Sequence, residues 1–205
     1  MNEFDIKAAE WDKNDMHRER ARAVAMAISK EIPLTGEMTA LEFGAGTGLL
    51  SFMLKDHLKE ITLIDNSEGM VKVLNEKLIA AKADNLTALK ADLEHEDLPE
   101  GGYDIIYTLM VLHHVGDVET VIKKFHGLLK PGGYLAIADL YTEDGSFHGD
   151  GFHGHRGFDP ASLEAMLARQ GFGGIKHNKV YVIDKKISEN RNKNFDVFLM
   201  TATRS

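Results

Sequence analysis

The sequence predicts an α/β fold built on a parallel sheet, and three observations lead to this prediction. Short runs rich in β-forming residues alternate with longer helical patterns, as in chains of β-α-β units. A glycine-rich turn joins the first strand to the first helix that follows it. The 205 residues suffice for one domain with a full core, and 43% of them are hydrophobic.

Three strands and two helices are predicted in the first part of this pattern. The strands are TALEFG (39–44), EITLIDN (60–66) and LTALKADL (86–93). The segment LLSFMLKDHL (49–58) carries its apolar residues on one helical face, and another helix should run from the second strand to about Ala83.

The next part adds two strands, YDIIYTLM (103–110) and YLAIADLY (134–141). A helix over 118–129 lies between them and is ended by the turn KPGG (130–133).

Helix signals coincide in the segment FDPASLEAMLARQGF (158–172). Asp159 stands where an N-cap residue is needed, and Pro160 follows at the first helical position. Gly171 marks the end of the predicted helix.

The two ends of the chain complete the prediction. KHNKVYVID (176–184) and FDVFLMTAT (195–203) are typical of an antiparallel pair of strands joined by a polar loop, 185–194. The N-terminal segment, 1–38, stands apart from the alternating domain of 39–205. It contains an amphipathic helix over 16–32, which should pack on the face of the sheet or cover its end.

Composition excludes several classes of function. The net charge of −8 argues against a nucleic-acid partner, which clustered Lys and Arg would bind. The absence of cysteine excludes disulfides, thiolate metal sites and a cysteine nucleophile. The acidic start does not resemble a signal peptide and no apolar run is long enough to span a membrane, so we expect a cytoplasmic protein with no membrane partner.

The glycine-rich turn is the strongest chemical signal. LEFGAGTGLLS (41–51) places Gly44, Gly46 and Gly48 between a strand and a helix, where the backbone can approach a ligand and helical amides favour an anion. Asp65 ends the second strand, nineteen residues after Gly46. A carboxylate at this spacing suits the two hydroxyls of a ribose.

Two cofactor classes fit this geometry. The dinucleotide fingerprint G-x-G-x-x-G needs glycine at position 49, where this chain has Leu49. An NAD(P)-dependent oxidoreductase is therefore the weaker alternative, and the turn suits a carboxylate better than a pyrophosphate.

Five motifs in register resemble the class I S-adenosylmethionine-dependent methyltransferases of the small, single-domain kind. They run in order from Leu41 to about Phe172 and consist of the E-x-G-x-G-x-G turn (Glu42 to Gly48), Asp65 in LIDNSEGM, Asp92 in KADLEHEDLP, YDIIYTLMVLHHV, and LKPGGYLAIAD. The resemblance implies a Rossmann-like three-layer sandwich with a seven-stranded, mostly parallel sheet whose last strand is antiparallel. It also implies S-adenosyl-L-methionine as the cofactor.

The resemblance assigns cofactor-binding roles to ten positions. They are Glu42, Gly44, Ala45, Gly46, Asp65, Asn66, Met70, Asp92, Leu93 and Leu109. The turn would receive the methionine part, Asp65 the ribose and Asp92 the adenine amino group. Asn66, Met70 and Leu93 would lie beside the adenine, and Leu109 would line the cofactor from the other side. Ordinary core packing is the alternative for Met70 and Leu93.

Methyl transfer from a sulfonium needs orientation and exclusion of water more than a fixed catalytic dyad. A base is required only when the acceptor arrives protonated. His114, beside His113 after the fourth strand, is a candidate catalytic residue, although such a histidine could instead order its loop.

A second group of histidines lies in FHGDGFHGHRGF (147–158), after the fifth strand. His153 is a tentative catalytic residue in a substrate-facing loop. His148, His153 and His155 could together bind a metal ion, but four glycines make the loop too loose, and no metal site is expected. A solvated loop without a chemical role is the third interpretation.

The acceptor is predicted by elimination to be a small molecule. The chain lacks the Asn/Asp-Pro-Pro-aromatic run of DNA amino methyltransferases after strand four, and it lacks the cysteines of arsenic methylation. Trp11, the only tryptophan, would cover the cofactor as part of a lid or anchor the N-terminal helix. A non-catalytic S-adenosylmethionine-binding protein remains an alternative, and the sequence does not predict the oligomeric state.

Overall fold

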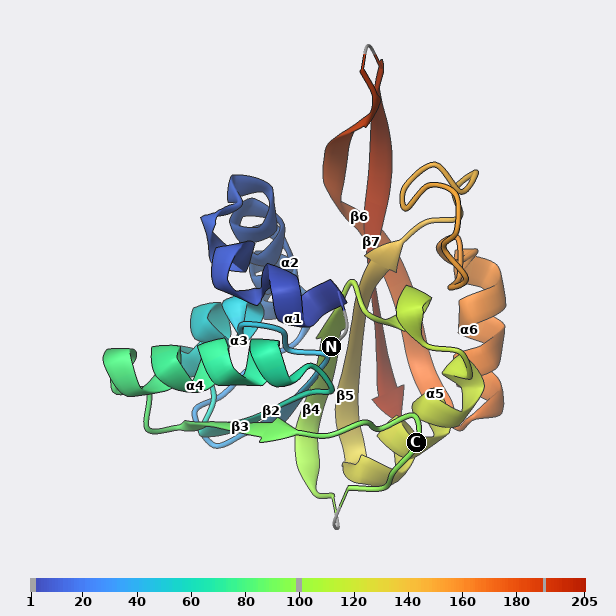
Figure 1. Cartoon of the computed structure of the whole chain (residues 1–205). Helices are drawn as coiled ribbons and strands as arrows, with labels where there is room; N and C mark the ends of the chain where they lie inside the picture. Colours follow the sequence, from blue (N-terminus) through green and yellow to red (C-terminus); the bar gives the residue numbers. More distant parts are fainter. Residues whose placement is uncertain (1–2, 99–100, 190) are drawn as a thin grey trace.

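Seven strands form one sheet in the order β3-β2-β1-β4-β5-β7-β6 in the computed structural model, which describes residues 3–98, 101–189 and 191–205 (Figure 1). The strands are β1 (Thr39–Phe43), β2 (Glu60–Asp65), β3 (Leu86–Lys90), β4 (Tyr103–Leu109), β5 (Leu129–Leu140), β6 (Phe172–Ser188) and β7 (Arg191–Arg204). β1 to β5 pair in parallel, and β7 is antiparallel to both β5 and β6. The predicted fold class is confirmed, including the reversed last strand.

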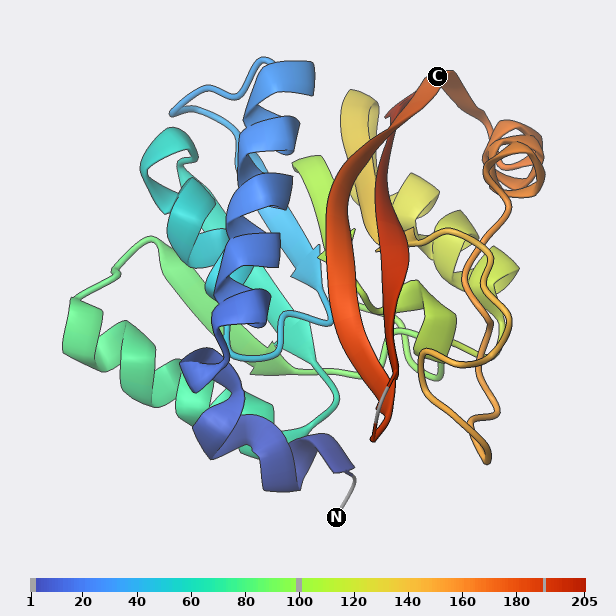
Figure 2. The ribbon, with the colours of Figure 1, turned by 90° about the horizontal axis from the view of Figure 1, so that it is seen from above.

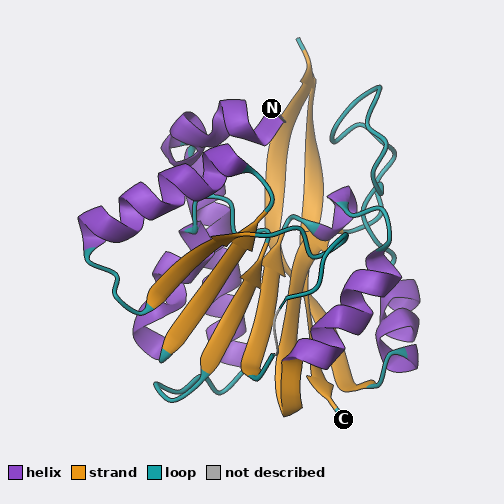
Figure 3. Cartoon of the chain, turned by 60° about the horizontal axis from the view of Figure 1, so that its bottom comes forward, coloured by secondary structure: helices purple, strands orange, loops and turns teal. Residues whose placement is uncertain are grey.

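Helices cover both faces of the sheet, which gives three layers (Figure 3). On one face lie α2 (Asp15–Glu31), α3 (Leu49–Leu54), η2 (Lys55–His57) and α4 (Glu68–Ala81); on the other lie α5 (Val118–Leu128) and α6 (Pro160–Arg169). Alternation along each strand fills both cores: Ile106 packs with α5 and α6, while its neighbours Ile105 and Tyr107 pack with α2 and α3.

Local capping chemistry sets the beginning of α6 as predicted. The Asp159 carboxylate accepts a hydrogen bond from the Ser162 amide at 3.0 Å, and Pro160 is the first helical residue. Gly171 has a φ of +88° just beyond the last turn, a conformation that glycine adopts readily.

The polar segment 185–194, expected to be a loop, instead extends the two C-terminal strands. Pairing continues to Ser188 opposite Arg191, and residue 190 lies outside the described residues. The paired ribbon rises beyond the rest of the sheet (Figure 1). Its backbone bonds are satisfied by the ladder, and Ile183 and Phe195 are buried beneath its polar side chains. The expected turn at 130–133 is likewise part of β5.

Two short elements precede the predicted N-terminal helix, α1 (Glu3–Lys7) and η1 (Ala8–Lys13) (Figure 2). The Asp5 carboxylate accepts hydrogen bonds from the Ser67 hydroxyl at 2.7 Å and from the Gly69 amide at 2.9 Å. These bonds tie α1 to the beginning of α4. Residues 1 and 2 of the predicted 1–38 segment lie outside the described residues.

Among the described residues, no helix has the length and apolar character that crossing a membrane requires.

Candidate active site

A cavity of about 1040 Å³ lies at the carboxyl ends of β1, β2 and β4. Its walls come from the glycine-rich turn after β1, the residues after β2 and β4, and the N-terminal elements α1, η1 and α2. The carboxyl edge of an open α/β sheet is where such folds bind ligands, and the volume is large for a single small molecule.

The glycine-rich turn forms the floor of this cavity. Gly44 has a φ of +67°, and a Cβ atom there would lie 2.4 Å from a methyl carbon of Val111, so no larger residue fits. Gly46 has a φ of +55°, and the nearest atom to a Cβ there would be the Met70 sulfur at 3.9 Å. The turn therefore keeps its backbone open to a ligand.

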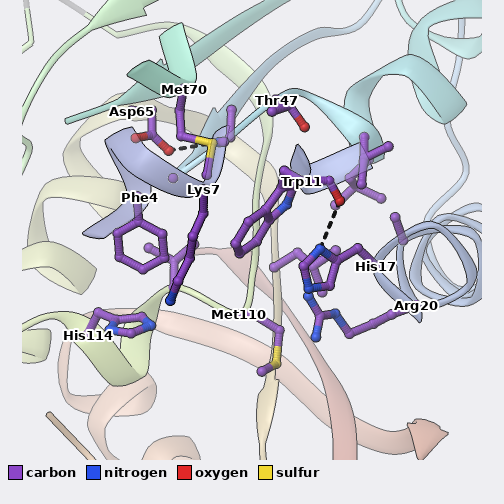
Figure 4. A pocket seen from close by; sticks show the side chains of 18 of the residues that line it. Phe4, Lys7, Trp11, His17, Arg20, Thr47, Asp65, Met70, Met110 and His114 are labelled. Atoms are coloured by element: carbon purple, nitrogen blue, oxygen red, sulfur yellow. Dashed lines mark hydrogen bonds between the residues drawn. The ribbon is translucent and has the colours of Figure 1, made fainter. Parts of the chain in front are cut away.

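Asp65 joins the end of β2 to this turn. Its Oδ2 accepts a hydrogen bond from the Gly46 amide at 2.7 Å, and its Oδ1 accepts one from the Ser67 amide at 2.8 Å. Burial raises the pKa of Asp65, against the opposing effect of these two amides. Figure 4 shows the carboxylate at the edge of the cavity, beside Met70.

Glu42 borders the same cavity from within a buried polar network. The Ser51 hydroxyl donates to the Glu42 carboxyl group, and Ser51 Oγ lies 2.7 Å from the Tyr107 hydroxyl oxygen. Burial raises the pKa of Glu42 to about 8, so the carboxyl group is largely protonated at neutral pH. Ser51 and Tyr107 were not predictable from the sequence, because no motif marks them.

The N-terminal elements close one side of the cavity. Trp11 lines it and stacks at 4.2 Å between ring centroids on His17 of α2, and Phe4 lies 5.2 Å from the His114 ring. The side chain of Asp12 accepts hydrogen bonds from Lys77 of α4, at 2.6 Å, and from the Thr47 hydroxyl in the glycine-rich turn. Trp11 thus both faces the cavity and anchors its own segment, so the two interpretations of this residue are compatible.

A buried histidine–carboxylate pair supports the opposite wall. His113 Nδ1 lies 2.6 Å from Asp139 Oδ1, and the two side chains are 1% and 0% exposed. A proton on Nδ1 directed at the carboxylate leaves Nε2 as an acceptor. His113 lines the cavity together with the predicted His114, in the short η3 helix (Leu112–His114). Asp139 had no signal in the sequence, because its partner is distant along the chain.

The histidine-rich segment divides into two parts. His148 lines the cavity and places a ring nitrogen within 4.8 Å of those of His113 and His114. His153 and His155 are exposed and do not line the cavity. The catalytic role of His153 stays a prediction that its position does not favour. The segment is also less loose than its glycines indicate, because Phe158 donates its amide to Leu140 and the Phe147 side chain is buried.

Nine of the ten predicted cofactor positions line the cavity. They are Glu42, Gly44, Ala45, Gly46, Asp65, Asn66, Met70, Asp92 and Leu109. Leu93 does not: it is buried in the core between the sheet and α5. Lining a cavity does not test the individual roles, which remain predictions.

Arg20 of α2 is the cavity residue that sequence analysis most clearly missed. It stands four and eight residues before Val24 and Ile28, on the buried stripe of the helix, and is 6% exposed. The signal in the sequence was a positively charged residue on the apolar stripe of a predicted helix, where such a residue is rarely buried without a partner.

Comparison with known proteins agrees with this geometry. Residues 41–135 match the family described as methyltransferase domain. An uncharacterized methyltransferase of Schizosaccharomyces pombe is 35% identical over 142 residues, which cover 62% of this chain and 50% of the relative. The chain spans about half the length of the first curated relatives that it matches.

Two solved structures share the fold. A SAM-dependent methyltransferase of Thermotoga maritima superposes with a TM-score of 0.73 at 19% identity, covering 98% of both chains. The phosphoethanolamine N-methyltransferase 2 of Haemonchus contortus, in complex with S-adenosyl-L-methionine, gives 0.72 at 14% identity, covering 100% of this chain and 60% of the other. At these identities the likeness concerns the fold.

Proposed function

Because this chain carries a methyltransferase domain of the class I fold, we propose that it binds S-adenosyl-L-methionine and transfers its methyl group to a small-molecule acceptor. The observation that carries the proposal is the Asp65 carboxylate, held against the glycine-rich turn at the edge of the cavity. A carboxylate in this position can accept hydrogen bonds from both hydroxyls of a ribose.

The residues present fit this cofactor. Gly44 lets Val111 pack directly against the turn, and the open space beside Gly46 leaves the backbone there available to the methionine part. Asp92 and Met70 line the same cavity and are the residues proposed to contact the adenine. The bound cofactor supplies an activated methyl group, so the task of the chain is to hold the acceptor in line and exclude water.

The acceptor is proposed to lie beneath the N-terminal elements, between Trp11 and the histidines. His113 has the geometry of a base, because Asp139 fixes its Nδ1 and its ring borders the cavity. His114 is the second candidate. Either histidine is required only for an acceptor that arrives protonated.

The proposed reaction uses no resident metal ion. His113, His114 and His148 form a cluster of possible ligands, but Lys7 and Lys185 line the same cavity. Their ammonium groups would oppose a divalent cation among the three rings.

Asp65→Ala tests the proposal. Calorimetry should show loss of S-adenosyl-L-methionine affinity by at least about tenfold, equivalent to about 1.4 kcal/mol, because the ribose loses its acceptor. Glu68→Ala is the matched control: it removes an exposed carboxylate a few residues away and should bind normally. Transfer of radiolabelled methyl to a panel of small molecules completes the test.

Wild-type protein that binds NAD(H) and not S-adenosyl-L-methionine would refute the proposal. Binding of S-adenosyl-L-methionine without transfer to any acceptor would instead favour the non-catalytic binding protein.

A further inference from the structure

The guanidinium group of Arg20 is buried at the cavity without a partner. Its Nε atom has no hydrogen bond, and no ion pair joins it to a carboxylate in the part of the chain that the structure describes. Arg204 differs: its Nε also lacks a hydrogen bond, but its Nη1 donates to the carbonyl groups of Gly127 and Leu129. Among buried side chains, arginine is normally paired, and an unpaired buried charge destabilises the fold.

The nearest carboxylate does not satisfy Arg20. Asp139 attracts it at a distance, but the Asp139 oxygens accept from His113 and from the Leu140 amide. Burial lowers the pKa of Arg20 to about 10, which still leaves it charged at neutral pH. The fold therefore keeps a positive charge at the cavity wall that none of the described residues binds.

Arg20 lies on the side of the cavity away from Asp65 (Figure 4). The groups whose charges act on it are Asp139 of β5 and Tyr181 of β6, whereas the glycine-rich turn and Asp65 belong to β1 and β2. In the sheet order, β4 separates these two pairs of strands. Arg20 is thus placed beyond the proposed cofactor, where an acceptor would bind.

Two further cations, Lys7 and Lys185, line the same cavity. Burial is the main cause that lowers the pKa of His17 and that of Lys185. Arg20 and Lys7 lower the pKa of His17 further, and Lys7 lowers that of Lys185 further, so the charges interact. All three line the cavity. Glu10 and Asp184 line the cavity as well, so the attraction for an anion is assigned to the unpaired Arg20 and not to the net charge of the lining.

We propose that Arg20 binds an anionic group, a carboxylate or phosphate, of the methyl acceptor. The inference rests on the proposed function and narrows its acceptor to an organic anion. The planar guanidinium can donate two parallel hydrogen bonds to such a group, and Lys7 and Lys185 add attraction. Trp11 and Met110 supply an apolar wall for the rest of the molecule.

Anion binding can be measured through the fluorescence of Trp11, the single tryptophan, in protein saturated with S-adenosylhomocysteine. The probes are benzoate, phenyl phosphate and the neutral benzamide. At least one anion should titrate saturably and at least about tenfold more tightly than benzamide, and the two anions distinguish carboxylate from phosphate.

Arg20→Met should lose the preference for the anion, and Arg20→Lys should keep part of it, because lysine retains the charge without the planar fork. Arg22→Met, an exposed arginine on the same helix, is the matched control and should titrate like wild type. A purely structural Arg20 would lower the melting temperature when replaced. If Arg20 is instead an unpaired buried charge, its removal should leave the melting temperature unchanged or raise it.

Several results would overturn the inference: no anion binding, equal binding of benzamide and benzoate, or anion binding by Arg20→Met as tight as by wild type. The inference would also be overturned if Arg20→Met lost affinity for S-adenosyl-L-methionine while its anion binding was unchanged. That result would assign Arg20 to the carboxylate of the cofactor. Failure of the proposed function is separate, because it would show as absent S-adenosyl-L-methionine binding in wild type. In that case the same anion titrations would be carried out on protein without S-adenosylhomocysteine, and they would still test whether Arg20 binds an anion.

Discussion

Glu42 shows, at the scale of a single residue, what burial does to the chemistry of this site. Its carboxyl group is 3% exposed and its pKa is raised from 4.5 to about 8, chiefly by desolvation. Ser51 donates to it and opposes part of this shift. Arg20 meets the same desolvation as a permanent cation, which cannot become neutral at physiological pH. Burial therefore leaves Glu42 neutral and Arg20 charged at the same cavity.

Stability should depend on pH through Glu42. The folded state holds its proton between about pH 4.5 and 8, where the unfolded state releases it, so this stabilisation is full below pH 4.5 and is lost as the pH rises through 8. Glu42→Gln stays neutral and can still accept from Ser51. Its melting temperature relative to wild type should therefore rise steadily from pH 5 to about pH 9 in thermal unfolding scans.

Each unit of pKa difference is worth about 1.4 kcal/mol, so the gap should reach a few kcal/mol. Asp65, whose pKa is also raised, is present in both proteins and cancels in the comparison. Parallel melting curves for the two proteins over this pH range would contradict the protonated state of Glu42.

At the scale of elements, α1 and η1 are held over the cavity by a few polar contacts. Asp5 binds the start of α4, and Asp12 joins η1 to both α4 and the glycine-rich turn. Segments with few such contacts open locally at low free-energy cost. The geometry suits a cover that admits ligands and then closes over them.

Asp12→Ala should loosen this cover. Because the Lys77 and Thr47 contacts are lost, S-adenosyl-L-methionine should dissociate several-fold faster in stopped-flow measurements, with an effect of about 1 kcal/mol. Asp15→Ala removes an exposed carboxylate at the start of α2 and is the control. Equal dissociation rates for the two variants would show that the segment does not gate the site.

At the scale of the whole molecule, stability comes from two apolar cores on opposite faces of one sheet. One core contains α5 and α6, and the other contains α2, α3 and α4. The cores are built from aliphatic and aromatic side chains, so hydrophobic burial is the main stabilising contribution. The histidine cluster lies at the cavity wall and is not part of either core.

Removal of metal ions should accordingly change nothing. Exhaustive dialysis against EDTA should leave the melting temperature and the affinity for S-adenosyl-L-methionine within error, because the proposed function assigns no metal ion to the cofactor positions and the two cores are apolar. Addition of Zn²⁺ to the dialysed protein is the complementary measurement. A rise in melting temperature that His148→Ala abolishes would establish a metal site instead.

The sequence alone determined the order of strands and helices, the turn at Gly44 to Gly48 and the place of Asp65. These features depend on local periodicity, on capping residues such as Asp159, and on a short spacing along the chain. The extension of β6 and β7 through 185–194 escaped prediction, because polar alternation in a paired ribbon looks like a solvated loop.

Only the tertiary structure decided which polar side chains meet at the cavity. His113 lies in η3, which follows β4, and Asp139 lies near the end of β5. His148 lines the same cavity, whereas His153 does not. Arg20 lies at the site because α2, which precedes β1 in the chain, packs on one face of the sheet. Packing of distant segments sets these distances, and no local pattern encodes them.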